Sequence, residues 1–341
     1  MQTYELQQFG TFDGLIQHER PTPQAGAGQI LVKVHARSLN FRDLLIVKQR
    51  YAVPARAGVV PLSDGAGEVV ALGAGVTTFA LGDRVTATYF PLWQDGRLNV
   101  LMGADQFGCT RDGMLAEYVL LDASSAVKLP AHLSFNEACT LPCAGVTAWN
   151  ALVGGRALAP GDVVLTIGTG GVALFALQFA KLFGARVVAV TSSEQKAALL
   201  RGMGADEVVN RTVHADWATE VRKLTQGRGV DHVVETGSIE TLPHSLAACA
   251  ANAELALVAA LGEGYLNASA LRGLVTIRRV FVGSKASFET MNRAISQHQL
   301  HPVIDSVFPF AEARLAYAHF EAKQHVGKVV IADTGVTASP L

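Results

Sequence analysis

The strongest constraint on this chain is an uncharged stretch, residues 163–180, that a glycine-rich segment interrupts near its start. Gly168-Thr-Gly170-Gly171-Val-Ala173 separates an apolar run at 163–167 from a second apolar run at 171–183. An unbroken apolar stretch of this length could cross a bilayer. A glycine turn inside it instead indicates a short buried strand followed by a buried helix. We therefore expect a β-turn-α unit within a folded core, and no membrane partner.

The pattern that follows repeats this unit. We expect strands at 186–191, 207–209, 230–235, 254–260 and 276–282. Helices are expected between them at 194–203, 215–225 and 241–250. Strands that alternate with helices in this way predict a doubly wound α/β fold, in which helices cover both faces of a parallel sheet.

The two ends of the chain have a different pattern. Short strands are expected at 29–37, 65–72, 83–88 and 114–121, separated by glycine turns, which predicts a small, partly open β-barrel. Ser134 and Glu137 form a capping box that begins a helical run through residue 150. After residue 283 we expect helices at 288–297 and 311–322 and a strand at 328–331.

The glycine turn predicts a binding site for a dinucleotide. Gly168 permits a tight turn, Gly170 lets the backbone approach a pyrophosphate, and the small Ala173 allows close packing of helix and strand. The helix that begins at Gly171 and Val172 offers free N–H groups and a positive dipole end to the phosphates. The alternative is a purely structural turn, but its position in a β-α-β series favours the Rossmann interpretation.

The end of the second strand of this series bears on which dinucleotide binds. Thr191, Ser192 and Ser193 stand where an acidic residue would select NADH, and Lys196 and Arg211 lie close by in sequence. Hydroxyl groups and cations favour the 2′-phosphate of NADPH. Glu194 would oppose that phosphate if it pointed inward. The alternative is a serine N-cap surrounded by solvated charges; we favour NADPH, with NADH as the second choice.

Composition excludes several kinds of partner. The net charge is −1 and no basic stripe is present, so neither nucleic acid nor a membrane surface is an expected partner. The N-terminal residues lack a signal sequence, and we expect a cytoplasmic protein. The four cysteines form no CxxC pair, which argues against a disulfide framework and against a structural zinc site.

Several motifs together resemble the medium-chain dehydrogenase/reductase superfamily, and in particular its zinc-independent, quinone oxidoreductase-like branch. The resemblance covers nearly the whole chain and also includes the glycine turn. The other motifs are Asn40-Phe-Arg-Asp43, Pro61-Leu-Ser-Asp64-Gly-Ala-Gly67, Gly82-Asp-Arg-Val85 and Leu141-Pro-Cys-Ala-Gly-Val-Thr147-Ala-Trp149. It implies a GroES-like barrel at 1–125, a Rossmann domain at 126–285 and a return to the barrel domain at 286–341.

The resemblance also implies that zinc is absent. Zinc enzymes of the superfamily hold their catalytic metal with cysteine, histidine and cysteine, and the matching positions here are Asn40, Ser63 and Cys143. A neutral amide and a hydroxyl are poor zinc ligands. The family's structural zinc needs four clustered cysteines, and the segment 90–110 contains only Cys109. We expect neither metal, and interpret Cys143 as a small apolar residue of a helix rather than a nucleophile.

Four residues are candidates for the reaction itself. Asn40 would orient a substrate carbonyl or the cofactor, or else cap the following helix. Asp43 would bond the Asn40 amide or, as we favour, accept from a backbone N–H. Tyr51 is a candidate proton donor to an enolate, although a packing role is the stronger expectation. Ser63 would donate a hydrogen bond near the position of the lost metal, while Asp64 would hold the barrel loop.

The resemblance places further cofactor contacts outside the glycine turn. Thr147 matches a position whose hydroxyl contacts the nicotinamide in relatives. Lys328 would reach the pyrophosphate, or else be a solvated lysine beside the last strand. The nicotinamide carboxamide would meet backbone at Ala259, Ala260 and Leu261, and at Phe281, Val282 and Gly283.

Three functions remain open at this point. The leading hypothesis is an NADPH-dependent, zinc-free reductase of quinones or of the activated C=C bond of α,β-unsaturated carbonyl compounds, because hydrogen-bond donors can stabilise the resulting oxygen charge without a metal. The alternatives are an alcohol or aldehyde dehydrogenase and a non-catalytic, crystallin-like dinucleotide-binding protein. The substrate would be a small molecule, which the sequence does not identify. A homodimer is expected, with strands at 276–282 pairing across the interface.

Overall fold

The polypeptide divides into two units at Val146 and at Val282. The computed structural model describes residues 1–258, 265–271 and 273–333. Unit 1 consists of Met1–Val146 and Gly283–Leu341, and unit 2 of Thr147–Val282. The sequence placed the first boundary after residue 125, whereas the contacts divide the chain after Val146.

Residues 126–146 belong to unit 1 because their contacts are made there. Strand β7 (Ala126–Lys128) pairs with β5 (Arg84–Ala87). The ring of Phe135 stacks on His35 at 4.6 Å between centroids, and the guanidinium of Arg84 lies 4.5 Å from the same ring. These contacts join the segment to the barrel strands, so a change in sequence pattern near residue 134 does not mark the unit boundary.

Among the described residues, unit 2 contains a six-stranded sheet in the order β10-β9-β8-β11-β12-β13, and every pairing in it is parallel. The strands are β8 (Val163–Ile167), β9 (Arg186–Thr191), β10 (Glu207–Asn210), β11 (Val230–Glu235), β12 (Cys249–Leu257) and β13 (Val275–Arg279). β8 and β11 are buried along their whole length, as expected for central strands of a sheet covered on both faces.

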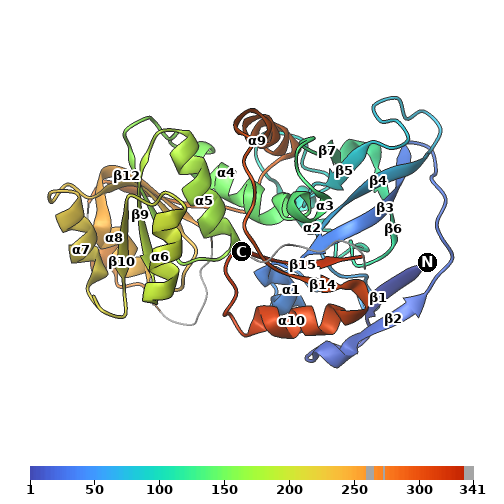
Figure 1. Ribbon diagram of the computed structural model, residues 1–341, viewed down its shortest axis with the longest axis horizontal. Coiled ribbons are helices and arrows are strands. Elements are labelled where there is room, and N and C mark those ends of the chain that lie inside the picture. Colours follow the sequence, from blue (N-terminus) through green and yellow to red (C-terminus); the bar gives the residue numbers. More distant parts are fainter. Residues whose placement is uncertain (259–264, 272, 334–341) are drawn as a thin grey trace. The chain divides into compact units, whose positions relative to one another are not determined.

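Helices cover this sheet on two sides. Figure 1 shows α5 and α6 on one side of the sheet and α7 and α8 on the other. The described helices of unit 2 are α4 (Val146–Val153), which begins at the last residue of unit 1, α5 (Gly171–Leu182), α6 (Glu194–Gly202), α7 (Trp217–Leu224), α8 (Leu242–Ala248) and the 3₁₀ turn η4 (Ala268–Leu271). This arrangement confirms the doubly wound α/β fold.

Unit 1 is dominated by a mixed sheet in the order β14-β15-β3-β4-β5-β7, in which β6 also pairs with β3. β3 is its centre, because it pairs with β4 along one edge and with both β6 and β15 along the other. A separate hairpin joins β1 to β2. Those strands whose bounds have not been given are β1 (Gln2–Leu6), β2 (Leu15–Glu19), β3 (Gln29–Ser38), β4 (Asp64–Leu72), β6 (Tyr118–Asp122), β14 (Ile304–Pro309) and β15 (Lys328–Ala332).

The helices of unit 1 are short, apart from two in its C-terminal segment. The described ones are α1 (Phe41–Val47), α2 (Val100–Ala104), α3 (Phe135–Ala138), α9 (Lys285–His298) and α10 (Ala313–Glu321), with a π-helical turn η3 (Leu141–Gly145) and 3₁₀ turns η1 (Phe12–Gly14), η2 (Ala123–Ser125) and η5 (Phe310–Glu312). No helix in the described part of the chain combines the length and the apolar character that a membrane crossing requires.

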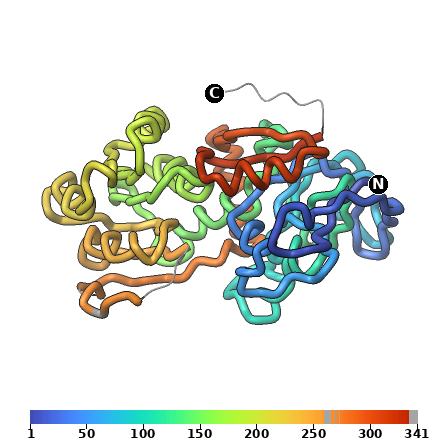
Figure 2. Tube along the Cα trace, turned by 90° about the horizontal axis from the view of Figure 1, so that it is seen from below, coloured from blue at the N-terminus to red at the C-terminus, as the bar shows by residue number. Residues whose placement is uncertain are grey.

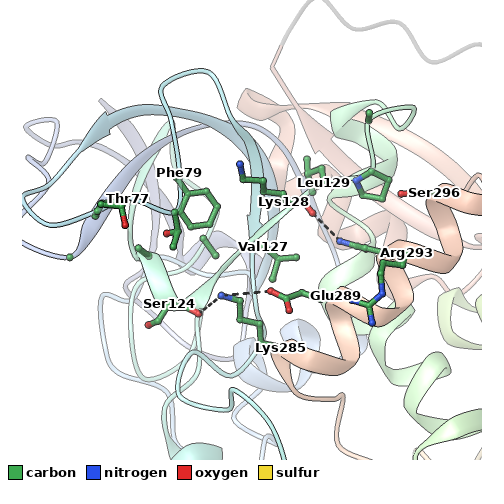
Figure 3. Close-up of a pocket in the computed structure, with 18 of the residues that line it drawn as sticks. Thr77, Phe79, Ser124, Val127, Lys128, Leu129, Lys285, Glu289, Arg293 and Ser296 are labelled. Carbon is green, nitrogen blue, oxygen red and sulfur yellow. Dashed lines mark hydrogen bonds and ion pairs between the residues drawn. The ribbon is translucent and has the colours of Figure 1, made fainter.

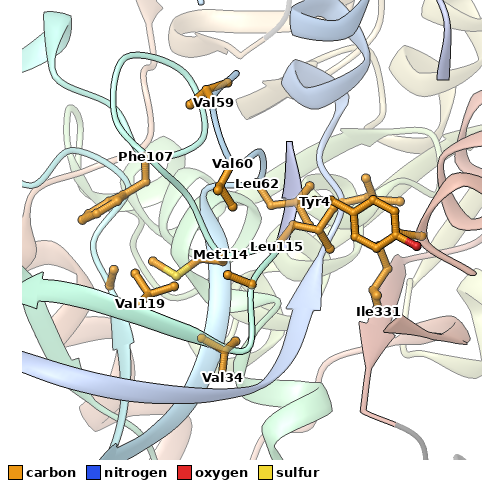
Figure 4. Packing of buried hydrophobic residues seen from close by; sticks show 14 of the residues in the cluster. Tyr4, Val34, Val59, Val60, Leu62, Phe107, Met114, Leu115, Val119 and Ile331 are labelled. Atoms are coloured by element: carbon orange, nitrogen blue, oxygen red, sulfur yellow. The ribbon is translucent and has the colours of Figure 1, made fainter. Parts of the chain in front are cut away.

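The core of unit 1 brings together both ends of the chain. Figure 4 shows Tyr4 and Leu115 close to Ile331 of β15. The C-terminal segment, red in Figure 2, contributes β15, which pairs antiparallel with β3. Arg37 of β3 is fully buried, and its guanidinium donates to the carbonyls of Val34, Met114 and Ala116 and to the carboxylate of Asp333. The C-terminal segment is therefore an integral part of the barrel unit.

Four expected elements differ clearly from the observed ones. The helical run expected at 134–150 starts at the predicted capping box but is divided into α3, η3 and α4, with Pro142, which lacks an N–H, within the π-helical turn. The strand expected at 114–121 is restricted to β6 because the backbone of Met114 and Leu115 bonds to the loop at 61–62. β12 starts earlier than expected, at Cys249, and β13 ends earlier, at Arg279.

A glycine substitution tests the packing of that loop. A Cβ atom on Gly113 would lie 2.0 Å from the carbonyl oxygen of Leu62, so we expect Gly113→Ala to lower the free energy of unfolding by about 1–3 kcal/mol. A Cβ on Gly202 of α6 would meet no atom within 4 Å, so Gly202→Ala should raise stability by up to about 1 kcal/mol. Urea unfolding measures both, and equal effects of the two variants would contradict the described packing.

Candidate active site and cofactor site

The glycine turn of unit 2 has the geometry that its sequence predicted. Gly168 has a φ of +83°, which favours glycine, and its N–H donates to the carbonyl of Val190 at 2.7 Å. Gly170 is the N-cap residue of α5, and a Cβ on it would meet nothing within 4 Å. Ala173 is buried against the strands. The turn therefore leaves open space at the N-terminus of α5, beside Gly171 and Val172, where a phosphate would meet free N–H groups.

The residues expected to contact the adenosine ribose of the dinucleotide lie at or just after the carboxyl ends of β9 and β10. The N–H of Arg211 donates to the carbonyl of Thr191 at 2.9 Å, which places the two strand ends together. Ser192 is exposed. The hydroxyl of Ser193 accepts from the N–H of Lys196 at 3.3 Å, so Ser193 is the N-cap of α6, as the alternative interpretation held.

The acidic residue beside this group is engaged elsewhere. The Glu194 carboxylate pairs with Arg201 at 2.8 Å, about two turns further along α6. Both side chains are more than half exposed, so the pair adds little stability. The pair nevertheless directs the negative charge of Glu194 towards Arg201, where it would oppose a bound 2′-phosphate less.

The remaining predicted cofactor residues of this part of the chain are placed unevenly. Ala259, Ala260 and Leu261 lie outside the described residues. Phe281 is half exposed, whereas Val282 is buried with a φ of +51°, a strained value for a β-branched residue. Asn150 holds the Val282 carbonyl through its Nδ2 at 2.6 Å.

Two further predicted positions adjoin the boundaries of the units. Thr147 is buried in the first turn of α4. Gly283 begins the second segment of unit 1. Neither position shows by itself what it binds.

Two polar residues beside the glycine turn were missed by sequence reasoning. The Thr236 hydroxyl donates to the carbonyl of Ile167, the last residue of β8, at 2.6 Å. Glu235 is fully buried. Burial raises the pKa of its carboxyl group, although hydrogen bonds from Ser245, Gly237 and Thr241 act in the opposite direction. Both end a strand adjacent to β8, and that adjacency follows from the strand order, which the sequence does not state.

In unit 1, Asn40 and Asp43 lie at the start of α1. Asn40 is the N-cap residue by position, and its backbone N–H donates to the Asp43 carboxylate at 2.8 Å. Burial raises the pKa of Asp43 to about 6, although the Arg42 guanidinium and the Asn40 N–H act in the opposite direction. Asp43 therefore accepts from a backbone N–H, the role we favoured for it.

Lys328 differs from one of the two expectations for it. It is 2% exposed, so it is not a solvated lysine. Its Nζ donates to the carbonyl of Leu39 and to Oδ1 of Asn40, both at 2.6 Å, and reaching a pyrophosphate would break both bonds. The Nζ also lies 4.0 Å from the carboxylate of Asp64. The first residue of β15 is thus a buried cation that is hydrogen-bonded to the Asn40 side chain.

Ser63, Asp64 and Cys143 complete this group. The Ser63 hydroxyl donates to Asp64 Oδ1 at 2.7 Å, and the N–H of Cys143 donates to Asp64 Oδ2 at 3.3 Å. Burial raises the pKa of Asp64, opposed first by Lys328 and then by its hydrogen-bond donors. Burial also raises the pKa of the Cys143 thiol, which favours the neutral form and not a thiolate. Asp64 connects β4 to η3, which fits its expected structural role.

This donor set does not suit zinc. The Asn40 oxygen already accepts from an ammonium group, and a second cation beside Lys328 would be repelled. The neutral hydroxyl of Ser63 is a weak ligand, and the single thiol of Cys143 does not hold zinc alone. Within the described ranges, no group of three or more histidine, cysteine, aspartate or glutamate side chains is arranged to hold a metal ion.

Tyr51 belongs to a second polar cluster of unit 1. Its hydroxyl lies 2.8 Å from the hydroxyl of Tyr89 and donates to Gln106 Oε1 at 2.9 Å. The Arg42 guanidinium lies over both rings, 5.3 Å from that of Tyr51 and 4.7 Å from that of Tyr89. Burial raises the pKa of Tyr51, and Arg42 opposes this. Tyr51 therefore has two hydrogen-bonding partners rather than a packing role alone.

Sequence reasoning assigned no catalytic or binding role to Arg42 or Gln106. Arg42 lies inside the Asn40–Asp43 motif, and its position between two candidates was an available signal. Its guanidinium donates to the Phe107 carbonyl at 2.8 Å, which anchors the loop that carries Gln106. That contact joins helix α1 to a loop 65 residues away in sequence, and it carries no local signal.

A cavity of about 890 Å³ also lies in unit 1, but none of the predicted site residues lines it. Figure 3 shows it between α9 and the segment around β7, with Phe79 on one side and Lys285, Glu289 and Arg293 on the other. Lys285 is already bonded to the Ser124 carbonyl at 2.9 Å. We therefore assign the chemistry to the polar clusters and not to this cavity.

The raised pKa of Asp43 predicts how stability depends on pH. Its ordinary value is 3.8, so the folded state retains the proton up to about pH 6 and the unfolded state does not. The stability from this group is fully present below pH 4 and is lost as the pH rises through 6. Relative to the parent, Asp43→Asn should gain about 2 kcal/mol between pH 4 and pH 7, measured by urea unfolding. A difference that stays constant with pH would contradict this.

Comparison with known proteins identifies the kind of domain in each unit. Residues 26–131 match the model of the alcohol dehydrogenase GroES-like domain, and residues 171–297 match that of the zinc-binding dehydrogenases. The first match covers most barrel strands of unit 1, and the second begins at the glycine turn. The expected GroES-like and Rossmann domains are therefore confirmed.

Individual relatives cover almost the whole chain. A zinc-type alcohol dehydrogenase-like protein of Schizosaccharomyces pombe is 40% identical over 330 residues, which are 94% of this chain and 95% of that protein. The structure of an NAD-dependent alcohol dehydrogenase is 33% identical with a TM-score of 0.87, covering 97% of this chain and 99% of the other.

Mycobacterial structures are also similar. One, complexed with NADPH, is 28% identical with a TM-score of 0.80, covering 97% of this chain and 100% of the other. A mycobacterial quinone oxidoreductase is 29% identical with a TM-score of 0.79, covering 97% and 99%. With a GroES-like unit, a dinucleotide-binding unit and relatives along its whole length, this chain belongs to the medium-chain dehydrogenase/reductase superfamily of oxidoreductases.

Proposed function

We propose that this oxidoreductase uses NADPH, without zinc, to reduce quinones or the activated C=C bond of α,β-unsaturated carbonyl compounds. The observation that carries the proposal is the hydrogen bond from Lys328 to Asn40, because a lysine ammonium engages a side chain that matches a metal ligand of the zinc enzymes. A site that holds donors rather than a Lewis acid suits substrates whose negative charge develops on an oxygen remote from the carbon that accepts hydride.

The residues of each unit have separate tasks in this proposal. Bound NADPH would supply the hydride, held at the glycine turn by Gly168, Gly170 and the N-terminus of α5. When hydride adds to the β-carbon of an enone, the π electrons move to the carbonyl oxygen, and a proton then adds to the α-carbon. Asn40 would stabilise the oxygen charge, and Tyr51, hydrogen-bonded to Tyr89, is the candidate proton donor.

Two observations support NADPH: the similar mycobacterial structure is complexed with NADPH, and cations follow the ends of β9 and β10. The similar structure of an NAD-dependent alcohol dehydrogenase is the argument for NADH.

We expect Lys196→Ala and Arg211→Ala each to raise the dissociation constant of NADPH about tenfold or more, because each would remove a charge-assisted hydrogen bond to the 2′-phosphate. Their affinity for NADH should be unchanged. Lys223→Ala, on α7, is the control for loss of an exposed lysine. Fluorescence titration measures all of these, and equal losses for both nucleotides would contradict the assignment.

An alcohol or aldehyde dehydrogenase is the second candidate, favoured by the names of the Schizosaccharomyces pombe relative and of the NAD-dependent neighbour. The decisive experiment follows NADPH oxidation with benzoquinone, with an enone and with a simple aldehyde, together with a zinc analysis of the purified protein. Turnover of quinone or enone by zinc-free protein is expected. Oxidation of alcohols, or stoichiometric zinc, would favour the second candidate, and nucleotide binding without turnover would favour a non-catalytic binding protein.

We also propose that the protein is a homodimer formed through β13. This strand ends the described sheet of unit 2, and Thr276 and Ile277 are exposed along it. Pairing with a second copy would cover an open sheet edge. Sedimentation at low micromolar concentration should give a dimer, and Ile277→Lys should shift it to monomer. A monomeric parent protein would refute the proposal.

A further inference from the structure

We infer that the Lys328 ammonium supplies the fixed positive charge of this site, and that it acts as a positioning residue by orienting Asn40 so that its amide nitrogen donates to a substrate oxygen. The inference rests on the proposed reductase function and assigns Lys328 a part in it. It replaces the expectation that Lys328 binds the pyrophosphate.

The first step is that the charge is built into the fold. Lys328 is the first residue of β15, and its side chain is 2% exposed. Nζ donates at 2.6 Å to the Leu39 carbonyl and at 2.6 Å to the Asn40 amide oxygen. The Asp64 carboxylate, 4.0 Å away, balances the charge without taking the ammonium from Asn40. A buried charge is tolerated because it is both paired and hydrogen-bonded.

The second step concerns the direction of the amide. An ammonium group has only donors, so the side of the Asn40 amide that faces it must be the oxygen. The NH₂ group is thereby turned the other way. A cation at the oxygen also polarises the amide and makes its N–H groups stronger donors.

The third step is that no described protein group accepts a well-formed hydrogen bond from this donor. Asn40 is 7% exposed, and its Nδ2 is buried without a hydrogen bond among the described residues. The amide lies near enough to lower the pKa of Asp64, but no hydrogen bond with acceptable geometry joins them. Leaving a buried donor unpaired is unfavourable. The arrangement suits an oxygen atom that the substrate brings.

These steps restrict the class of substrate. An N–H donor next to a fixed cation stabilises an oxygen that gains negative charge during the reaction, as a quinone or enone carbonyl does. It gives no such advantage to an acceptor carbon without a conjugated carbonyl. The site therefore favours conjugated carbonyl compounds over isolated alkenes.

Three variants test the inference. Lys328→Met keeps most of the side-chain length and removes the charge. Asn40→Asp keeps an oxygen for Lys328 but removes the NH₂ donor, and Asn40→Ala removes both. Lys33→Met applies the first substitution to an exposed lysine of β3 and is the control. We measure kcat and KM with benzoquinone and with an enone, and NADPH binding by fluorescence.

We expect Lys328→Met and Asn40→Asp to lower kcat at least about tenfold, with NADPH affinity within about twofold of the parent. In the double variant Lys328→Met/Asn40→Ala, loss of Lys328 should cause no further decrease beyond Asn40→Ala, because Lys328 acts through Asn40. An equal decrease in both backgrounds, or parental kcat in either Lys328→Met or Asn40→Asp, would overturn the inference. If Lys328→Met does not fold, Asn40→Asp alone decides.

A measurement without turnover separates this inference from the proposed function. In protein labelled with ¹⁵N-asparagine, the Asn40 side-chain signal is identified by its loss in Asn40→Asp, and it should shift upfield in Lys328→Met but not in Lys33→Met. An unchanged signal shows that Lys328 does not hold Asn40 and refutes the inference. Absence of any NADPH oxidation together with the expected shift refutes the proposed function and the catalytic part of the inference, but leaves the contact established.

Discussion

The hydrogen bonds of Lys328 join the last strand of the barrel unit to the residue that begins its first helix. Asn40 and Lys328 are separated by 288 positions in the chain, and the ammonium also holds the Leu39 carbonyl. Asp64 balances this charge and in turn accepts from Ser63 and from the backbone of Cys143. Four segments therefore depend on one buried cation, and the positions that match the metal ligands of zinc relatives are organised around it.

The same unit contains a second way of managing buried charge. Arg42 lies over the rings of Tyr51 and Tyr89 and anchors the loop at Phe107. Its guanidinium also lies 3.8 Å from Asp43, whose pKa burial raises to about 6. In both clusters a buried cation lies beside a candidate site residue: Lys328 beside Asn40, and Arg42 beside Tyr51. In the described part of unit 2, in contrast, the polar groups at the predicted cofactor positions include the backbone N–H groups at the start of α5 and the exposed side chains of Ser192 and Arg211 at the ends of β9 and β10.

Local patterns predicted much of this structure. The strands at 163–167, 186–191 and 230–235 have the expected bounds, and the capping box of Ser134 begins α3 as expected. Prediction failed where distant segments compete for the same backbone groups. The strand expected at 114–121 lost its first residues to the loop at 61–62, and residues 126–146 joined the barrel unit because β7 and Phe135 found partners there.

The sequence by itself determined the β-turn-α unit and its dinucleotide-binding turn, because the conformation of glycine and the period of apolar residues act over a few neighbouring positions. It also determined which residue types stand at the positions of the zinc ligands. Only the tertiary structure decided which groups surround those positions. A lysine beside a terminal strand can be solvated, bind phosphate or be buried, and contacts from Leu39, Asn40 and Asp64, far away in sequence, made Lys328 a buried cation.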